Sequence, residues 1–216
     1  MRALTERQMT ELGNSRKHLF VDELTDILRA AKDASILHHT FLLVCYQHAL
    51  RAQEVCNIRM EDLDMRQKLL RTERLKGGLD TTQDIVQVKG NSLICEYAAL
   101  KAWLAERVED GGRFLFNSQK AERFHPSTLT RIFKKYCQIA SDERIEKGLK
   151  PIPQTLWHLH VLRHTAITNL CRTIDNPIKV QQWVGHKNLA TTMIYAHPSM
   201  RESSRAVIKA TYEIFA

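Results

Sequence analysis

Apolar residues recur at helical spacing along most of this chain, and only the stretch 67–88 clearly departs from that pattern. The spacing is plain in the series Val21, Leu24, Ile27, Leu28 and Ala31, with Asp22 placed to cap the start of the helix. Within 67–88, residues 69–72 and 84–88 have the composition of strands, and the turn-rich Lys76-Gly77-Gly78 separates them. The sequence therefore predicts a mainly α protein with a small antiparallel β-sheet.

Further helices are expected on both sides of this sheet. They are one or two mostly buried helices within 36–57, an amphipathic helix through 97–108, another starting near Pro126, one containing 160–172 and a short one ending at Gly185. Gly185 would form a C-cap, because glycine adopts the left-handed backbone conformation without strain. Residues 141–156 contain a glycine and two prolines and are expected to form a loop.

Size and charge narrow the possible partners. A chain of 216 residues is long enough to bury one hydrophobic core. We divide the chain into an arm (1–18), a domain (19–200) and a tail (201–216). The net charge of +8 favours an anionic partner, with nucleic acid ahead of a membrane surface. The five cysteines form no C-x-x-C pair, and the longest apolar run, 41–46, is too short for a membrane span. We expect a soluble, cytoplasmic protein with reduced thiols and no membrane partner.

Two arginines and an adjacent histidine have the chemistry of a phosphate site. His160 and Arg163 are three residues apart, so on a helix they share one face and can reach one ligand. An arginine fork can hold two phosphate oxygens, and a second arginine, Arg51, could help to neutralise charge that develops during attack. Glu54 lies three residues after Arg51 and could orient it.

Tyr195 is the expected nucleophile, and three other side chains would assist it. A phenol has a pKa of about 10, so it needs a base or positive surroundings to attack a phosphate. His160 could promote deprotonation, Lys76 could protonate the leaving 5′ oxygen, and His186 could donate a hydrogen bond to the phosphate. A phosphotyrosine ester conserves the energy of the broken phosphodiester, so no ATP, metal or other cofactor is expected. Lys68 and Lys89 flank the same hairpin and are alternatives to Lys76.

In this order the residues resemble the active site of the tyrosine recombinase (phage integrase) family. That site contains an arginine near Leu-Arg-x-x-Glu, a β-hairpin lysine, His-x-x-Arg, Leu-Gly-His and a downstream tyrosine. The matching positions are Arg51, Lys76, His160, Arg163, His186 and Tyr195. The resemblance covers about residues 20–200 and implies the catalytic-domain fold of that family for 19–200. It also implies a 3′-phosphotyrosyl intermediate.

The chain departs from the family pattern in three places. Val184 replaces the usual leucine before Gly185-His186, and Gln53 stands where a small residue is common. About 20 residues precede the first match, too few for the N-terminal DNA clamp of most members. In this the chain is similar to the short recombinases of the fimbrial phase-variation type, and Arg74-Leu75-Lys76-Gly77 followed by Thr81-Thr82 resembles their hairpin.

The resemblance implies a site-specific recombinase, an integrase or invertase, acting in association with the nucleoid. Its partners would be double-stranded DNA recombination sites, three further protomers in a homotetramer, and accessory DNA-bending proteins. In this family the tail often packs on a neighbouring protomer, and packing within the same chain is the alternative. Two other functions fit the same residues: nicking and resealing in the manner of a type IB topoisomerase, and DNA-binding regulation. A regulator would have no need of Tyr195.

Two further groups of polar residues have a structural and a functional interpretation. Thr128, Arg131, Lys134 and Lys135 form a polar stripe on the helix that starts near Pro126, either as a solvated face or as a DNA contact. His158, His160 and His164 could suggest zinc, but H-E-x-x-H is absent and a third ligand would have to come from elsewhere. Hydrogen-bonded histidines are the better interpretation for His158 and His164, and no metal site is predicted.

Overall fold

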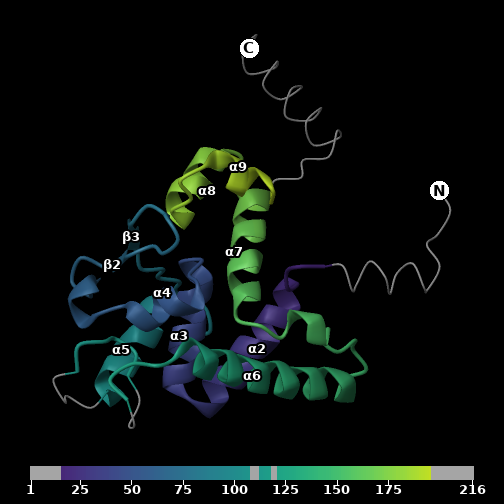
Figure 1. Ribbon diagram of the computed structural model, residues 1–216. Coiled ribbons are helices and arrows are strands. Elements are labelled where there is room, and N and C mark those ends of the chain that lie inside the picture. Colours follow the sequence, from purple (N-terminus) through teal and green to yellow (C-terminus); the bar gives the residue numbers. More distant parts are fainter. Residues whose placement is uncertain (1–15, 108–111, 118–120, 196–216) are drawn as a thin grey trace, which may run out of the picture.

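Helices make up most of the computed structural model, which describes residues 16–107, 112–117 and 121–195 (Figure 1). The α-helices are α2 (Val21–Ala34), α3 (Ile36–Gln47), α4 (Ala52–Asn57), α5 (Glu96–Glu106), α6 (Pro126–Glu146), α7 (His160–Thr173), α8 (Pro177–Val184) and α9 (Leu189–Met193). Two 3-10 turns, η1 (Met60–Asp62) and η2 (Gln154–Leu156), accompany them. The strands are β1 (Leu63–Asp64), β2 (Leu69–Thr72) and β3 (Thr81–Asp84). The prediction of a mainly α protein with a small antiparallel sheet is confirmed.

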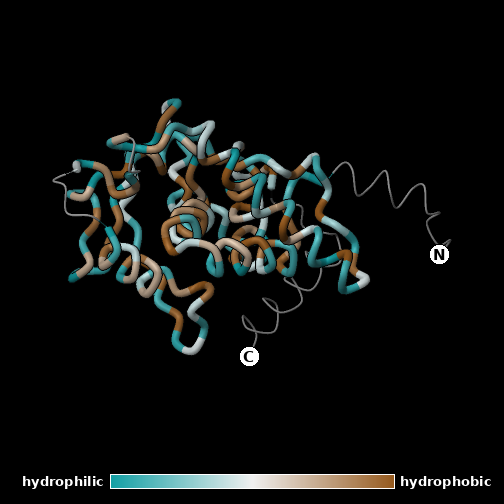
Figure 2. Tube along the Cα trace, turned by 90° about the horizontal axis from the view of Figure 1, so that it is seen from below, coloured by the Kyte–Doolittle hydropathy of each residue, from teal (hydrophilic) through white to brown (hydrophobic). Residues whose placement is uncertain are grey.

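Helix α3 forms the centre of the main hydrophobic core. Its residues Phe41, Leu42 and Leu43 are fully buried, and α2, α5 and α7 all contact it. Apolar stretches gather toward the inside of the fold and hydrophilic ones toward the outer loops (Figure 2). This body supports α7, which rises from it in Figure 1 toward α8 and α9.

Helix α2 begins differently from the sequence prediction. Its N-cap is Phe20, whose backbone N–H donates to the Glu23 carboxylate at 2.8 Å. Asp22 therefore does not cap the helix. It lies in the first turn and, with Asp26, binds the Arg144 guanidinium of α6 at 2.9 and 2.7 Å. Residues 141–146 were expected to form a loop, but α6 continues to Glu146. Within this stretch the side chains of Ser141 and Arg144 are buried, and the contact of Arg144 with α2 holds the end of the helix on the fold.

The sheet is antiparallel, in the order β1-β2-β3, with Thr72 paired to Thr81 at the turn end of the hairpin. The prediction of a strand at 84–88 is wrong except at Asp84, because β3 lies at Thr81–Asp84. Ile85 still donates its N–H to the Lys68 carbonyl at 2.8 Å, but the next residue, Val86, donates its N–H to the Glu96 carboxylate at 2.9 Å instead. The strand-like side chains at 85–88 thus belong to a connection toward α5.

A second, smaller core joins the C-terminal helices to the body. Ala49, Ala166, Ile167, Val180 and Val184 are buried together, and Tyr195 packs at its edge. Helix α8 ends at Gly185 with φ +71°, which confirms the predicted C-cap. Most of the expected arm (1–18), all of the expected tail (201–216) and the expected end of α5 at Val108 lie outside the described residues. No helix in the described ranges has both the length and the apolar character needed to cross a membrane.

Candidate active site

Arg163 lies one turn into α7, buried against the turn between α3 and α4. Its side chain is 3% exposed, and its Nη1 donates to the carbonyl of Ala49. Ala49 has φ +51°, an unusual conformation for a residue with a Cβ. This conformation turns its carbonyl toward the guanidinium groups. Burial first, and then the charge of Arg51, lower the pKa of Arg163 to about 10.

Arg51 and Glu54 form the centre of a cluster of charged groups. The Arg51 Nη1 donates to Glu54 Oε1 at 2.6 Å, and the Arg51 backbone N–H donates to Oε2 at 2.9 Å. Arg163 Nη1 lies 3.8 Å from the same carboxylate. Burial alone would raise the pKa of Glu54, but these hydrogen bonds outweigh it, so the pKa is lowered. Glu54 is thus a fully buried anion that binds two arginines, one at the N-cap of α4 and one in α7.

Arg74 is a third arginine in this cluster, and sequence reasoning assigned it no role. Its guanidinium contacts Glu54 at 3.4 Å, the His48 carbonyl at 3.0 Å, Gln83 at 3.1 Å and the Trp183 carbonyl at 3.3 Å. The side chain is fully buried. Arg74 therefore ties the β2–β3 hairpin to both the α3–α4 turn and the end of α8.

His160 and His186 lie within electrostatic reach of Arg51 and Arg163. Burial, His164 and Arg163 lower the pKa of His160 to about 4, and burial, Arg163 and Arg51 do the same for His186. Both imidazoles are therefore neutral at pH 7. His186 is buried and its Nδ1 lies 2.8 Å from the Thr192 hydroxyl, which fixes the ring.

Tyr195 follows α9 and reaches back to α7. Its hydroxyl lies 2.8 Å from Nδ1 of His164, and the two rings are 5.5 Å apart between centroids. Burial raises the pKa of Tyr195, while the charges of Arg163 and Arg51 oppose that rise. Sequence reasoning expected His164 to be hydrogen-bonded but did not foresee this partner. The available signal was its position one turn after His160 on the same helix face.

Lys76 occupies the exposed turn of the β2–β3 hairpin and has φ +58°. The turn is held at its base, because Arg51 Nη1 donates to the Leu75 carbonyl at 3.1 Å and Leu75 donates its N–H to Glu54 at 3.1 Å. Lys68 lies before β2, at the other end of the hairpin, and its ammonium binds Gln87 at 2.7 Å. The structure thus brings Arg51, His160, Arg163, His186 and Tyr195 into one region, with Lys76 on a turn attached to it.

The polar stripe on α6 is exposed at three of its four positions. Arg131, Lys134 and Lys135 are exposed, and Thr128 is partly buried. The charge of Lys134, after burial, lowers the pKa of His158, which places this end of the stripe close to the start of α7.

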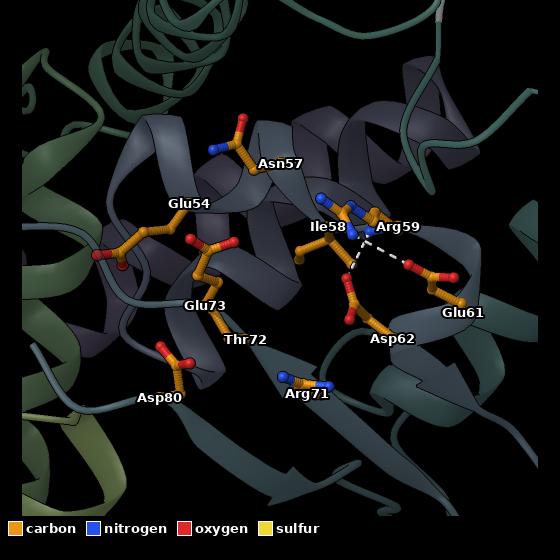
Figure 3. Close-up of a pocket in the computed structure, with 10 residues that line it drawn as sticks. All are labelled: Glu54, Asn57, Ile58, Arg59, Glu61, Asp62, Arg71, Thr72, Glu73 and Asp80. Atoms are coloured by element: carbon orange, nitrogen blue, oxygen red, sulfur yellow. Dashed lines mark hydrogen bonds and ion pairs between the residues drawn. The ribbon is translucent and has the colours of Figure 1, made fainter.

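A pocket of about 360 Å³ lies beside the charged cluster rather than at Tyr195. It is lined from α4, η1 and the hairpin, and five of its side chains are acidic: Glu54, Glu61, Asp62, Glu73 and Asp80 (Figure 3). Arg59 pairs with Glu61 at 3.1 Å on one side of it. Apart from Glu54, none of the predicted site residues lines this pocket. An acidic surface of this kind does not suit a phosphate.

Comparison with known proteins identifies the family. Residues 17–202 match the Phage integrase family, and the chain belongs to it. It is 30% identical to tyrosine recombinase XerA of Pyrococcus furiosus over 197 residues, covering 90% of this chain and 62% of the relative. It is 29% identical to the type 1 fimbriae regulatory protein FimB of Escherichia coli K12, covering 85% of both chains. The chain spans only 54–62% of the length of three of the curated tyrosine recombinases that it matches.

Solved structures show the same fold. The crystal structure of XerA recombinase superposes with a TM-score of 0.67 at 24% identity, covering 89% of this chain and 64% of the other. The Tn1549 transposon integrase in complex with circular intermediate DNA gives a TM-score of 0.66 at 20% identity, covering 91% of this chain and 68% of the other. The fold is that of a tyrosine recombinase catalytic domain.

Proposed function

We propose that the protein is a site-specific DNA recombinase that cuts and rejoins DNA through a 3′-phosphotyrosyl intermediate. The observation that carries this proposal is the position of the Tyr195 hydroxyl, which contacts His164, the residue after Arg163 on α7, at 2.8 Å. At this position the charges of Arg163 and Arg51 oppose the rise in its pKa. A phenol within electrostatic reach of two guanidinium groups, one on α7 and one at the N-cap of α4, suits attack on a phosphodiester, because the same charges can bind the phosphate and stabilise the transition state. The similarity to tyrosine recombinases along most of the chain supports the same reaction.

Each polar side chain then has a role. Tyr195 attacks the phosphorus, and Arg51 and Arg163 hold the non-bridging oxygens. His186 donates its Nε2–H to the phosphate, in the tautomer whose Nδ1 accepts from the Thr192 hydroxyl. His160 is neutral and can support the nucleophile or the phosphate. Glu54 orients both arginines.

Lys76 is our choice among the three hairpin lysines for the acid that protonates the leaving 5′ oxygen. Arg51, one of the two arginines proposed to hold the phosphate, donates to the carbonyl of Leu75, the residue before Lys76. The turn is therefore connected to the proposed phosphate site. Lys68 lies beyond the opposite end of β2 and is engaged with Gln87 and the Tyr97 ring. Lys89 follows the connection after β3 and is farther along the chain from the turn.

The assembly on DNA follows from the same proposal. Four protomers would act on two double-stranded recombination sites, aided by accessory DNA-bending proteins and associated with the nucleoid. Residues 19–200 would form the catalytic domain, 1–18 an arm, and 201–216 a tail that docks on a neighbouring protomer. The exposed Arg131, Lys134 and Lys135, with Thr128, would contact the DNA.

A nicked suicide substrate tests the reaction. Such DNA loses a short fragment after cleavage, so the covalent protein–DNA adduct accumulates. The wild-type protein should form an adduct on its own recombination site, which flanking inverted repeats would identify. Tyr195→Phe should form none, and Tyr97→Phe, a control that removes another partly buried phenol, should react normally.

The result separates the proposed reaction from its rivals. An adduct that persists in Tyr195→Phe refutes the nucleophile. Relaxation of supercoiled plasmid without recombinant product would indicate a topoisomerase-like activity, and DNA binding without an adduct on the identified site would indicate a regulator.

A further inference from the structure

The hydroxyl of Tyr195 has a specific partner in His164. The 2.8 Å contact joins the phenol oxygen to Nδ1, across 31 residues of sequence. Among the described residues, no hydrogen bond joins Tyr195 to His160, the histidine that the sequence suggested as its base. The His160 ring instead packs edge to face against His164, with centroids 4.5 Å apart.

The direction of this hydrogen bond follows from the protonation states. Burial raises the pKa of Tyr195, so the phenol keeps its proton at pH 7. Burial first, and then nearby titratable groups, lower the pKa of His164, so its imidazole is neutral. Those groups are the imidazoles of His158 and His18 and the cationic side chains of Lys17 and Arg163. The phenol O–H is therefore the donor, Nδ1 accepts, and the imidazole proton is on Nε2.

We propose that His164 is the general base that activates Tyr195, a role that rests on the proposed recombinase function. The Tyr195 O–H bond breaks and its proton moves to Nδ1 of His164 as the phenol oxygen bonds to phosphorus. The bond from phosphorus to the 5′ oxygen then breaks, and that oxygen takes a proton from Lys76. His164 returns its proton to the tyrosine oxygen when the strand is rejoined.

A weakly basic imidazole suffices for this step. The phenol oxygen becomes far more acidic as its bond to phosphorus forms, so the proton moves downhill during attack rather than before it. The positive charge on His164 then develops beside the His160 ring, which is neutral because its pKa is about 4. The incoming phosphate brings negative charge that further favours protonated His164.

Three variants of His164 and Tyr195 on the suicide substrate test the proposal. His164→Ala removes both base and hydrogen bond, and His164→Asn keeps a hydrogen-bonding group of limited basicity. Each should lower the single-turnover rate of adduct formation by roughly 10²–10⁴-fold. A wild-type rate in His164→Asn would show that His164 only positions the phenol and would overturn the proposal. Wild type without an adduct would instead refute the recombinase function itself, and Tyr195→Phe with one would refute the nucleophile.

Chemical rescue separates a base from a structural residue. His164 is partly exposed, so small imidazoles can enter the space left in His164→Ala. Added imidazoles should restore the rate, and more basic ones should restore it better. Rescue also shows that the variant is folded. If His164→Ala has the wild-type melting temperature but no imidazole increases its rate, proton transfer to this position is refuted.

A modified leaving group shows whether His164 acts on the Tyr195 oxygen or on the leaving 5′ oxygen. In DNA with sulfur in place of the 5′ bridging oxygen, the thiolate departs without a proton. Lys76→Ala should then react at close to the wild-type rate, while His164→Ala should stay slow because the phenol must still lose its proton. Recovery of His164→Ala on this substrate would mean that His164 serves the leaving group, contrary to the proposal.

Discussion

Leu79 of the hairpin rests directly on Gly185, the residue before His186. The Leu79 N–H donates to the Gly185 carbonyl at 3.0 Å, and a Cβ at Gly185 would lie 2.5 Å from the Leu79 carbonyl oxygen. The same Cβ would lie 3.0 Å from Cγ of Arg74. The turn that carries Lys76 and the loop that carries His186 are therefore in contact through backbone atoms.

Gly185→Ala should displace the hairpin. Ala at φ +71° costs about 1 kcal/mol of stability, and the clash with the Leu79 carbonyl adds to this cost. Gly148→Ala is the matched control, because Gly148 also has φ +71° but open space around its Cβ position. Urea unfolding should show the larger loss for Gly185→Ala, and single-turnover cleavage should fall in that variant alone. Equal losses of stability would contradict the contact.

Glu54→Gln should be strongly destabilising. It removes the carboxylate that binds Arg51, Arg74 and Arg163 in a buried cluster, and breaking such a network typically costs about 3–5 kcal/mol. Glu61→Gln is the comparison: Glu61 pairs with Arg59, but its side chain is 70% exposed, so the loss should stay below about 1 kcal/mol. Chemical denaturation of both variants measures the difference. Similar small losses would show that Glu54 is not the centre of the cluster.

Stability should fall in mild acid through His186. Its folded pKa of about 4 lies below the unfolded value of 6.5, so between these values the unfolded chain binds more protons. Stability therefore decreases as the pH falls from 6.5 toward 4, by roughly 2–3 kcal/mol for this buried group. His186→Gln cannot titrate, so its deficit relative to wild type should shrink over that window. A deficit that is independent of pH would refute the lowered pKa.

The stripe on α6 can be tested by the salt dependence of DNA binding. If Lys134 contacts a phosphate, Lys134→Ala should reduce the slope of log K against log salt by about 0.9. Lys147→Ala is the control, because Lys147 caps the same helix and is 58% exposed beside Glu143. Anisotropy titrations over a range of salt would measure both slopes. An unchanged slope in Lys134→Ala would make the stripe a solvated face.

Local spacing predicted the parts of the site that lie on one element. The i, i+3 spacing of His160 and Arg163 indicated a shared helix, and α7 begins at His160. Arg74 was not predictable in this way, because its partners lie 26 and 109 residues away in sequence and a hairpin arginine is usually solvated. The pairing of His164 with Tyr195 likewise depends on how α9 returns to α7. Periodicity indicates helices, but it does not indicate which distant polar groups meet.

The cluster around Glu54 has a consequence for how the protein recognises its ligand. One carboxylate faces three guanidinium groups, and burial together with the charge of Arg51 lowers the pKa of Arg163. A tetrahedral oxyanion bound between Arg51 and Arg163 would add negative charge to this cluster. Occupancy by phosphate or vanadate should then raise the melting temperature, as ligands that bind only the folded state do. Binding of the anion and stabilisation of the folded protein would therefore depend on the same charged cluster.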